Sequence, residues 1–211
     1  MARILRALEK DILTEIGSMC AGNATTALAQ ILGRRVELQF PHVKLVTFNK
    51  LPLDLSSYPE EVVMGIHMQI LGEMHGNALL VFPRRTAFSL IDVLIGPLEE
   101  DENSPTELGI SAIKEMGNVV ISSYLSTLTA FTGISAFSST VNLINGSAKY
   151  LAHLAFFGLG KDERHETLLI EALFKELKKD ISGNFFIVFD IASMNALLKK
   201  SLQMLKSKRM F

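Results

Sequence analysis

The stretches Glu15-Ile16-Gly17-Ser18 and Glu115-Met116-Gly117-Asn118 resemble each other, with glutamate and glycine at the same places. The second lies 100 positions after the first, and the same offset joins Gly33 to Gly133. A correspondence that needs no gap over this distance indicates an internal repeat. The chain is therefore expected to contain two similar halves, each beginning with a long helix.

The repeat continues beyond these helices at a larger offset. Residues 76–82 resemble residues 183–189, which lie 107 positions later. The second half therefore contains seven additional residues. We expect them in the loop around residues 158–163, because polar, glycine-containing loops tolerate insertions.

Each half is predicted to form a helix, several strands and a closing helix. The first helix is expected from about Arg3 to Leu32. The second is expected to start at the capping box Ser104-Pro105-Thr106-Glu107 and to end near Thr132. Glycine in the left-handed conformation, here Gly33 and Gly133, is a common helix stop. Closing helices are predicted at 84–95 and 192–206. The β-like runs are 36–40, 44–48, 62–71, 77–82, 138–143, 151–157, 168–177 and 185–189.

Successive hairpins in both halves, with turns at 72–76 and 178–183, favour a mostly antiparallel sheet. The predicted fold class is α+β, a pseudo-two-fold duplicated unit with long helices packed on the sheet. The predicted organisation is one domain, 1–211, made of repeats of about 1–100 and 101–211.

Composition excludes several classes of protein. The chain has 211 residues, of which 48% are hydrophobic and 20% are charged, so it can bury a full core. Its net charge of -1 gives no reason to expect binding to nucleic acid or to an acidic membrane. No apolar run reaches the roughly 18 residues of a membrane helix, so stable membrane insertion is not expected.

The single cysteine, Cys20, cannot form a disulfide within the chain, which fits a reducing compartment and a cytoplasmic location. Its small-residue neighbours favour a buried packing role over a nucleophile. The five histidines show no metal-ligand spacing, and residues 158–161 lack the spacing of a phosphate-binding loop. Neither a metal site nor a nucleotide site is predicted.

A polar stripe is expected along one face of each long helix, because positions three and four apart are neighbours on a helix. In the first helix the stripe contains Asp11, Glu15 and Ser18. In the second it contains Ser111, Glu115, Asn118 and Ser122. A solvated surface is the ordinary interpretation of such a stripe, but recurrence of the acid at equivalent positions favours a function.

The glycine after each acid strengthens that interpretation, because glycine inside a helix costs roughly 1 kcal/mol relative to alanine. Gly17 and Gly117 occupy equivalent positions. Either a partner approaches the backbone there, or two helices pack closely against each other. The sequence leaves both explanations open.

The two stripes resemble the motif Asp/Ser-x3-Glu-x2-Asn-x22-Pro of the CheC / CheX / FliY family of chemotaxis phosphatases, and most closely free-standing CheC. The first copy has Asp11, Glu15 and Pro41, with Ser18 in place of asparagine. The second copy has Ser111, Glu115 and Asn118, with Val141 in place of proline. The resemblance extends over nearly the whole chain.

The resemblance implies that the protein removes phosphate from an aspartate of the response regulator CheY. Asn118 would orient the attacking water, as a glutamine does in GTPases. Glu115 would pair with the active-site lysine of the regulator, and Gly117 would allow the regulator to come close. No cofactor of its own is implied, since the Mg²⁺ belongs to the bound regulator.

The departures from the motif make the two sites unequal. Serine has no amide and a shorter reach, so Glu15 and Ser18 are predicted to form a weakened site. Glu115 and Asn118 are the predicted catalytic pair. The supporting positions are Asp11, Gly17, Pro41, Ser111 and Gly117. The alternative function is a non-catalytic adaptor that binds the receptor deamidase CheD or proteins of the flagellar switch.

Overall fold

The structure is a computed structural model, and it describes residues 6–47, 62–96, 105–156, 159, 166–176 and 181–208. The first half contains α1 (Ala7–Leu32), β1 (Val36–Thr47), β2 (Val62–Gly72), β3 (Gly76–Pro83) and α3 (Arg84–Ile95). The second half contains α4 (Glu107–Thr132), β4 (Ala136–Ser138), β5 (Asn142–Ser147), α5 (Ala148–Ala155), β6 (Glu166–Glu176), β7 (Ile181–Phe189) and α6 (Ile191–Lys208). The predicted boundary near residue 100 lies outside the described residues.

The strands form one sheet in the order β1-β6-β7-β3-β2-β4, with β5 also paired to β2. Every pairing between the described strands is antiparallel, so the predicted α+β class with a mostly antiparallel sheet is confirmed. β1 of the first half pairs with β6 of the second, whereas β4 and β5 of the second half pair with β2 of the first. Each half therefore completes the sheet of the other.

Strand pairing places the additional residues of the second half in two locations. Ile66 faces Leu80 across the β2–β3 hairpin, and Ile170 faces Ile187 across the β6–β7 hairpin. Ile66 and Ile170 are 104 positions apart, whereas Leu80 and Ile187 are 107 apart. Four additional residues thus precede β6 and three lie between β6 and β7. The expectation of one seven-residue insertion near 158–163 is wrong, because pairing fixes the strands but leaves both connections free to lengthen.

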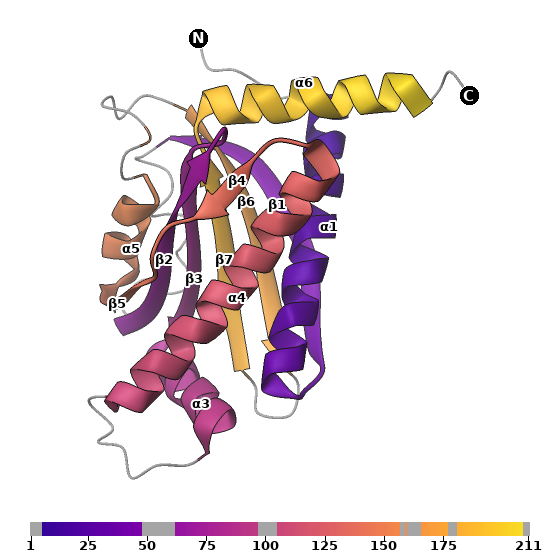
Figure 1. Cartoon of the computed structure of the whole chain (residues 1–211). Coiled ribbons are helices and arrows are strands. Elements are labelled where there is room, and N and C mark those ends of the chain that lie inside the picture. Colours follow the sequence, from indigo (N-terminus) through magenta and orange to yellow (C-terminus); the bar gives the residue numbers. More distant parts are fainter. Residues whose placement is uncertain are drawn as a thin grey trace.

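α1 and α4 lie side by side across one face of the sheet (Figure 1). Their inward residues, among them Leu13 and Ile16 on α1 and Ile113 on α4, join alternate residues of β2 in the main core. α5 lies on the opposite face of the sheet. There Leu151 packs in a second cluster with the strand residues that alternate with those of the main core. The period-two alternation of strand side chains separates the two clusters.

Helix ends follow the expected chemistry, with one shift. Gly33 and Gly133 end α1 and α4 with φ of 59° and 68°, as predicted. The N-cap of α4 is Thr106, whose hydroxyl oxygen accepts a hydrogen bond from the Gly109 amide at 3.1 Å. The predicted start of the second helix at Ser104, with Pro105 at the first helical position, is therefore wrong, because Thr106 caps the helix and Glu107 is its first residue. The first helix begins at Ala7, about one turn after the predicted Arg3.

Two predicted strands were wrong. Residues 151–157 were expected to be a strand, but most of them belong to α5. Ser147 caps this helix by accepting from the Tyr150 amide, and Leu151 and Ala155 are buried one turn apart. The predicted run 138–143 is interrupted, since β4 ends at Ser138 and β5 begins at Asn142.

Candidate functional site

The predicted polar stripe of α4 lies on the outer face of the helix. Ser111 and Glu115 are exposed and Asn118 is partly buried, whereas Ile113 and Met116 between them are buried in the core. The helical period thus brings these three of the four predicted polar side chains to one accessible surface. α1 has the same arrangement, with Asp11 and Glu15 exposed and Ser18 partly buried.

The Asn118 carboxamide has a hydrogen-bonded neighbour. The Ser122 hydroxyl donates to Asn118 Oδ1 at 3.4 Å, and it lies 3.4 Å from the Ser138 hydroxyl. Ser138 belongs to β4, so the contact joins the helix to the edge of the sheet. Sequence reasoning placed Ser122 on the stripe but missed Ser138, which comes from a separate strand.

Ser18 is oriented differently. Its hydroxyl donates to the backbone carbonyl of Thr14, one turn earlier in α1, at 2.8 Å. Serine hydroxyls inside helices often use this local acceptor. The positions equivalent to Ser122 and Ser138 are Gly22 and Leu38, which have no side-chain hydroxyl. The first copy therefore lacks both the amide and its neighbours.

The motif glycines face the sheet and not the outer surface. Gly117 is buried, and a Cβ atom there would lie 2.5 Å from Cδ1 and 2.7 Å from Cγ2 of Ile66 on β2. Gly17 is also buried, and its Cβ would lie 3.1 Å from Cγ2 of Ile170 on β6. Gly117 therefore faces a strand of the sheet and not a surface that the regulator could approach. The alternative of close packing between two helices is also corrected, because the neighbour of each glycine is a strand.

The motif proline marks an irregularity in a strand. Pro41 is buried in β1, where the pairing with β6 shifts register between Gln39 and His42. Proline has no N–H to donate to a ladder and is found at such positions. In the second half Val141 lies between β4 and β5, which both still pair with β2. Replacement of the proline therefore leaves the pairing on both sides in place.

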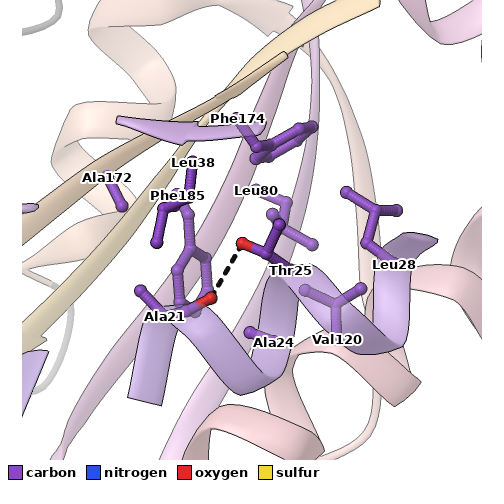
Figure 2. Close-up of a pocket in the computed structure, with 10 residues that line it drawn as sticks. All are labelled: Ala21, Ala24, Thr25, Leu28, Leu38, Leu80, Val120, Ala172, Phe174 and Phe185. Atoms are coloured by element: carbon purple, nitrogen blue, oxygen red, sulfur yellow. Dashed lines mark hydrogen bonds between the residues drawn. The ribbon is translucent and has the colours of Figure 1, made fainter. Parts of the chain in front are cut away.

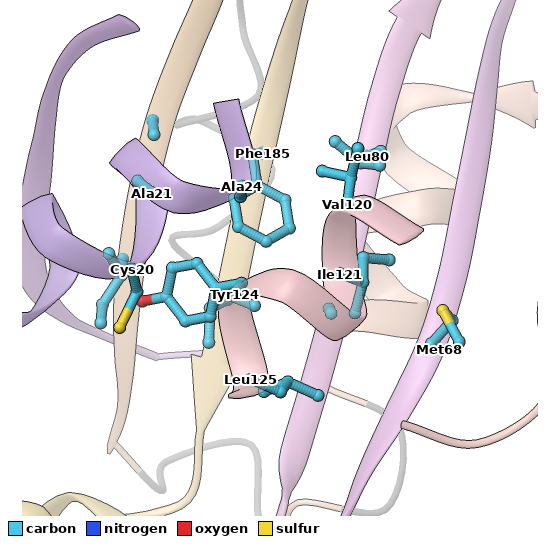
Figure 3. Packing of buried hydrophobic residues seen from close by; sticks show 14 of the residues in the cluster. Cys20, Ala21, Ala24, Met68, Leu80, Val120, Ile121, Tyr124, Leu125 and Phe185 are labelled. Atoms are coloured by element: carbon cyan, nitrogen blue, oxygen red, sulfur yellow. The ribbon is translucent and has the colours of Figure 1, made fainter. Parts of the chain in front are cut away.

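The core between the two helices contains Cys20 and Tyr124 (Figure 3). Cys20 is fully buried, as predicted, and burial raises the pKa of its thiol to about 12. A thiol in this state is a poor nucleophile. Tyr124 stacks edge-on against Phe185, with ring centroids 5.1 Å apart.

A small apolar cavity lies beneath α1 (Figure 2). Its volume is about 10 Å³, and its lining includes Ala21, Thr25 and Phe174. The Thr25 hydroxyl donates to the carbonyl of Ala21 at 2.8 Å. The cavity is thus a packing gap and offers no room for an organic ligand.

Two further observations concern ligands and membranes. Within the described ranges, no three or more histidine, cysteine, aspartate or glutamate side chains are grouped closely enough to hold a metal ion. In the same part of the chain, no helix has the length and apolar character needed to cross a membrane.

The sequence matches known chemotaxis proteins. A model of the CheC-like family matches residues 8–44, which run from α1 through Pro41 into β1. The chain is 31% identical over 133 residues to the CheY-P phosphatase CheC of Bacillus subtilis. That match covers 62% of this chain and 63% of the relative, so it spans less than two thirds of the relative's length.

The fold also matches solved structures. FliY of Thermotoga maritima superposes with a TM-score of 0.73 at 19% identity, covering 95% of this chain and 99% of that chain. The middle domain of FliM from H. pylori gives a TM-score of 0.64 at 14% identity, covering 93% and 99%. The sequence is thus CheC-like on a fold shared with FliY, and the predicted resemblance to the CheC / CheX / FliY family is confirmed.

Proposed function

We propose that this chain hydrolyses the aspartyl phosphate of the response regulator CheY, mainly through Glu115 and Asn118 of α4. The observation that carries the proposal is the accessible stripe on α4, in which an exposed acid is followed one turn later by a carboxamide. The similarity to a CheY-P phosphatase supports the choice of substrate.

The proposed reaction needs a positioned water and no covalent intermediate. Water attacks the phosphorus atom, the bond from phosphorus to the aspartate oxygen breaks, and inorganic phosphate leaves. The Oδ1 atom of Asn118 accepts a hydrogen bond from the water and holds the water in line with the breaking bond. The Mg²⁺ that neutralises the phosphate is supplied by the regulator.

Glu115 has a docking role in this proposal. Its carboxylate is exposed, which supports an ion pair with the active-site lysine of the regulator as its proposed role. Such a contact fixes the position of the Asn118 side chain relative to the phosphoaspartate. Ser111 lies one turn earlier on the same face and extends the contact surface.

The first copy is proposed to contribute little. Glu15 is exposed and can dock, but the hydroxyl proton of Ser18 is directed to the Thr14 carbonyl. Ser18 also lacks the carboxamide oxygen that holds the water in the second copy. The two helices are therefore proposed to be unequal.

The experiment is release of inorganic phosphate from phosphorylated CheY, with the protein at substoichiometric concentration. Asn118→Ala should reduce the rate by about 100-fold, the size typical for loss of one group that stabilises the transition state. Ser18→Ala is the matched variant and should change the rate by less than twofold. If Ser18→Ala abolishes release and Asn118→Ala does not, the assignment of the sites is wrong.

A second candidate function is a non-catalytic adaptor. The fold is shared with the FliM middle domain, which supports a role among flagellar switch proteins, and binding to CheD is the other adaptor role. An adaptor would bind its partner without turnover of phosphorylated CheY. Co-purification with switch proteins or CheD, together with absent turnover, would favour this function.

A further inference from the structure

Asn118 is connected to the sheet through two serines. The Ser122 hydroxyl donates to Asn118 Oδ1, and the Ser138 hydroxyl lies within 3.4 Å of Ser122. Because Ser122 uses its proton toward Asn118, the Ser138 hydroxyl is the donor of the second contact. Ser138 therefore donates a hydrogen bond to Ser122, and Ser122 donates one to Asn118.

Ser138, the first donor in this series, lies in a strand that other hydrogen bonds hold in place. Ser138 pairs with Ile70 of β2, and the neighbouring Ser139 amide donates to the Gln69 carbonyl at 2.9 Å. Thr129 at the end of α4 accepts from the Ala136 amide at 3.1 Å. β4 is thus fixed both to the sheet and to the helix that carries Asn118.

Ser122 uses its hydroxyl differently from Ser18, Thr127 and Thr132. Ser18, Thr127 and Thr132 each donate to a backbone carbonyl four residues earlier. Ser122 donates to a side chain four residues earlier. Its hydrogen bond therefore acts on the orientation of an amide instead of on the helix backbone.

That orientation matters for the proposed chemistry. The terminal torsion of asparagine is broad, so an amide without a partner samples many orientations. A carbonyl oxygen has two lone pairs, and Ser122 occupies one of them. The second lone pair of Asn118 Oδ1 is left for the water. Because the Ser122 hydroxyl donates, it favours the amide orientation in which the oxygen, and not the nitrogen, faces Ser122.

We propose that Ser122, supported by Ser138, is a positioning residue that orients the Asn118 carboxamide toward the attacking water. This inference rests on the proposed phosphatase function. Contacts of 3.4 Å are long for hydroxyl donors, and catalytic hydrogen bonds often shorten in the reacting complex. The first copy, with Gly22 and Leu38, has neither hydroxyl.

The first test measures kcat and KM for phosphate release from phosphorylated CheY. Ser122→Ala should lower kcat by about 3- to 10-fold, the range expected from one net hydrogen bond, with KM changed less than twofold. Ser138→Ala should give a smaller loss of kcat. Ser126→Ala, an exposed serine on the same helix, is the control and should have no effect. Unchanged kcat in Ser122→Ala, or an effect on KM alone, overturns the proposal.

The second test builds the contact in α1. In an Asn118→Ala background, Ser18→Asn alone is compared with Ser18→Asn combined with Gly22→Ser. A Cβ at Gly22 meets no atom within 4 Å, so the added serine fits. The double replacement should release phosphate about 3- to 10-fold faster than the single one, by the same hydrogen-bond range. Equal rates overturn the proposal.

The third test does not depend on catalysis. The side-chain amide order parameter of Asn118, measured by NMR relaxation, should fall in Ser122→Ala and stay unchanged in Ser126→Ala. If the order parameter falls as expected but the parent protein releases no phosphate, the proposed function fails while the contact stands. If the order parameter stays unchanged in Ser122→Ala, the positioning role is overturned.

Discussion

Gly117 of α4 packs directly on Ile66 of β2, and Gly17 of α1 packs in the same way on Ile170 of β6. Ile66 and Ile170 are equivalent positions in the two halves. Each motif helix is therefore seated on a strand from the opposite half. This arrangement sets the height of Glu115 and Asn118 above the sheet, because a side chain at Gly117 would push the helix outward.

Gly117→Ala should destabilise the protein more than Gly17→Ala. At Gly117 the new methyl would overlap Ile66, and overpacking of a core typically costs about 1–3 kcal/mol. At Gly17 the contact of 3.1 Å needs only a small movement of Ile170, and the helix gains about 1 kcal/mol from alanine. Urea denaturation of both variants measures the difference.

A double-mutant cycle checks the cause of that difference. In an Ile66→Ala background, the cost of Gly117→Ala should fall, because the two nearest atoms of Ile66 are absent. An unchanged cost would show that the glycine is required for another reason. Equal destabilisation by Gly17→Ala and Gly117→Ala would also contradict the packing explanation.

Tyr124→Phe should stabilise the protein. Among the described residues the buried Tyr124 hydroxyl has no hydrogen-bond partner. Burial, with a smaller effect from nearby Cys20, raises the pKa of this phenol well above its usual value. An unpartnered buried polar group costs about 1–3 kcal/mol, so its removal should raise the free energy of unfolding by about 1 kcal/mol. Phenylalanine keeps the edge-on contact with Phe185.

Thermal and urea denaturation check this prediction. Tyr124→Leu is a matched control, because it removes the hydroxyl together with the aromatic ring and should destabilise the core. If Tyr124→Phe is less stable than the parent, the hydroxyl contributes a favourable contact and the prediction is wrong.

His67 should make folding stability depend on pH. Its Nε2 lies 2.9 Å from Asn77 Oδ1, while Asn77 Nδ2 donates to the Ala155 carbonyl. The Asn77 oxygen therefore faces the ring, and we assign the proton of the neutral ring to Nε2. Burial lowers the pKa of His67 below its usual 6.5, although the hydrogen bond to Asn77 partly opposes this shift.

The sign follows from proton binding. Below pH 6.5 the unfolded chain takes up a proton at this residue more readily than the folded protein does. The contribution of His67 to the free energy of unfolding is therefore fully present above pH 6.5. It is lost as the pH falls from 6.5 to the lower pKa of the folded state. Urea denaturation between pH 5 and pH 8 should show this loss. His67→Gln should reduce it, whereas His75→Gln, at an exposed histidine, should not.

Local patterns predicted the long helices well, because each has a repeated sequence and a glycine stop. The exchange of strands between halves could not be predicted, since pairing of β1 with β6 depends on contacts across more than a hundred residues. α5 was missed because a short apolar run fits a strand or a helix equally. Ser147, a good N-cap residue placed before that run, was the signal that could have corrected it.

The polar stripes were predictable from the spacing of residues along each helix. The contacts that other parts of the chain make with the stripe of α4 were not. Glu115 and Asn118 follow from the helical period, and their catalytic role stays a prediction. Ser138 reaches Asn118 through Ser122 from a strand of the same half, which spacing on one helix cannot reveal. The burial of Gly117 likewise depends on Ile66, a residue distant in sequence.

Leu108 should extend the proposed contact with the regulator. Leu8 and Leu108 occupy equivalent positions, and each is 58% exposed in the first turn of its helix. Leu108 lies one turn before Ser111 on the face that carries Glu115. An exposed leucine beside the polar stripe can bury its side chain against a docked partner, and partial burial of a leucine contributes about 1 kcal/mol.

Leu108→Ser should therefore raise KM for phosphorylated CheY by about 5-fold, which corresponds to about 1 kcal/mol, and leave kcat nearly unchanged. Leu8→Ser is the matched variant and should have little effect, because the α1 site is proposed to contribute little turnover. Steady-state kinetics of phosphate release separate the two constants. A loss of kcat in Leu108→Ser, or an equal effect of Leu8→Ser, would show that the regulator does not dock preferentially along the α4 face.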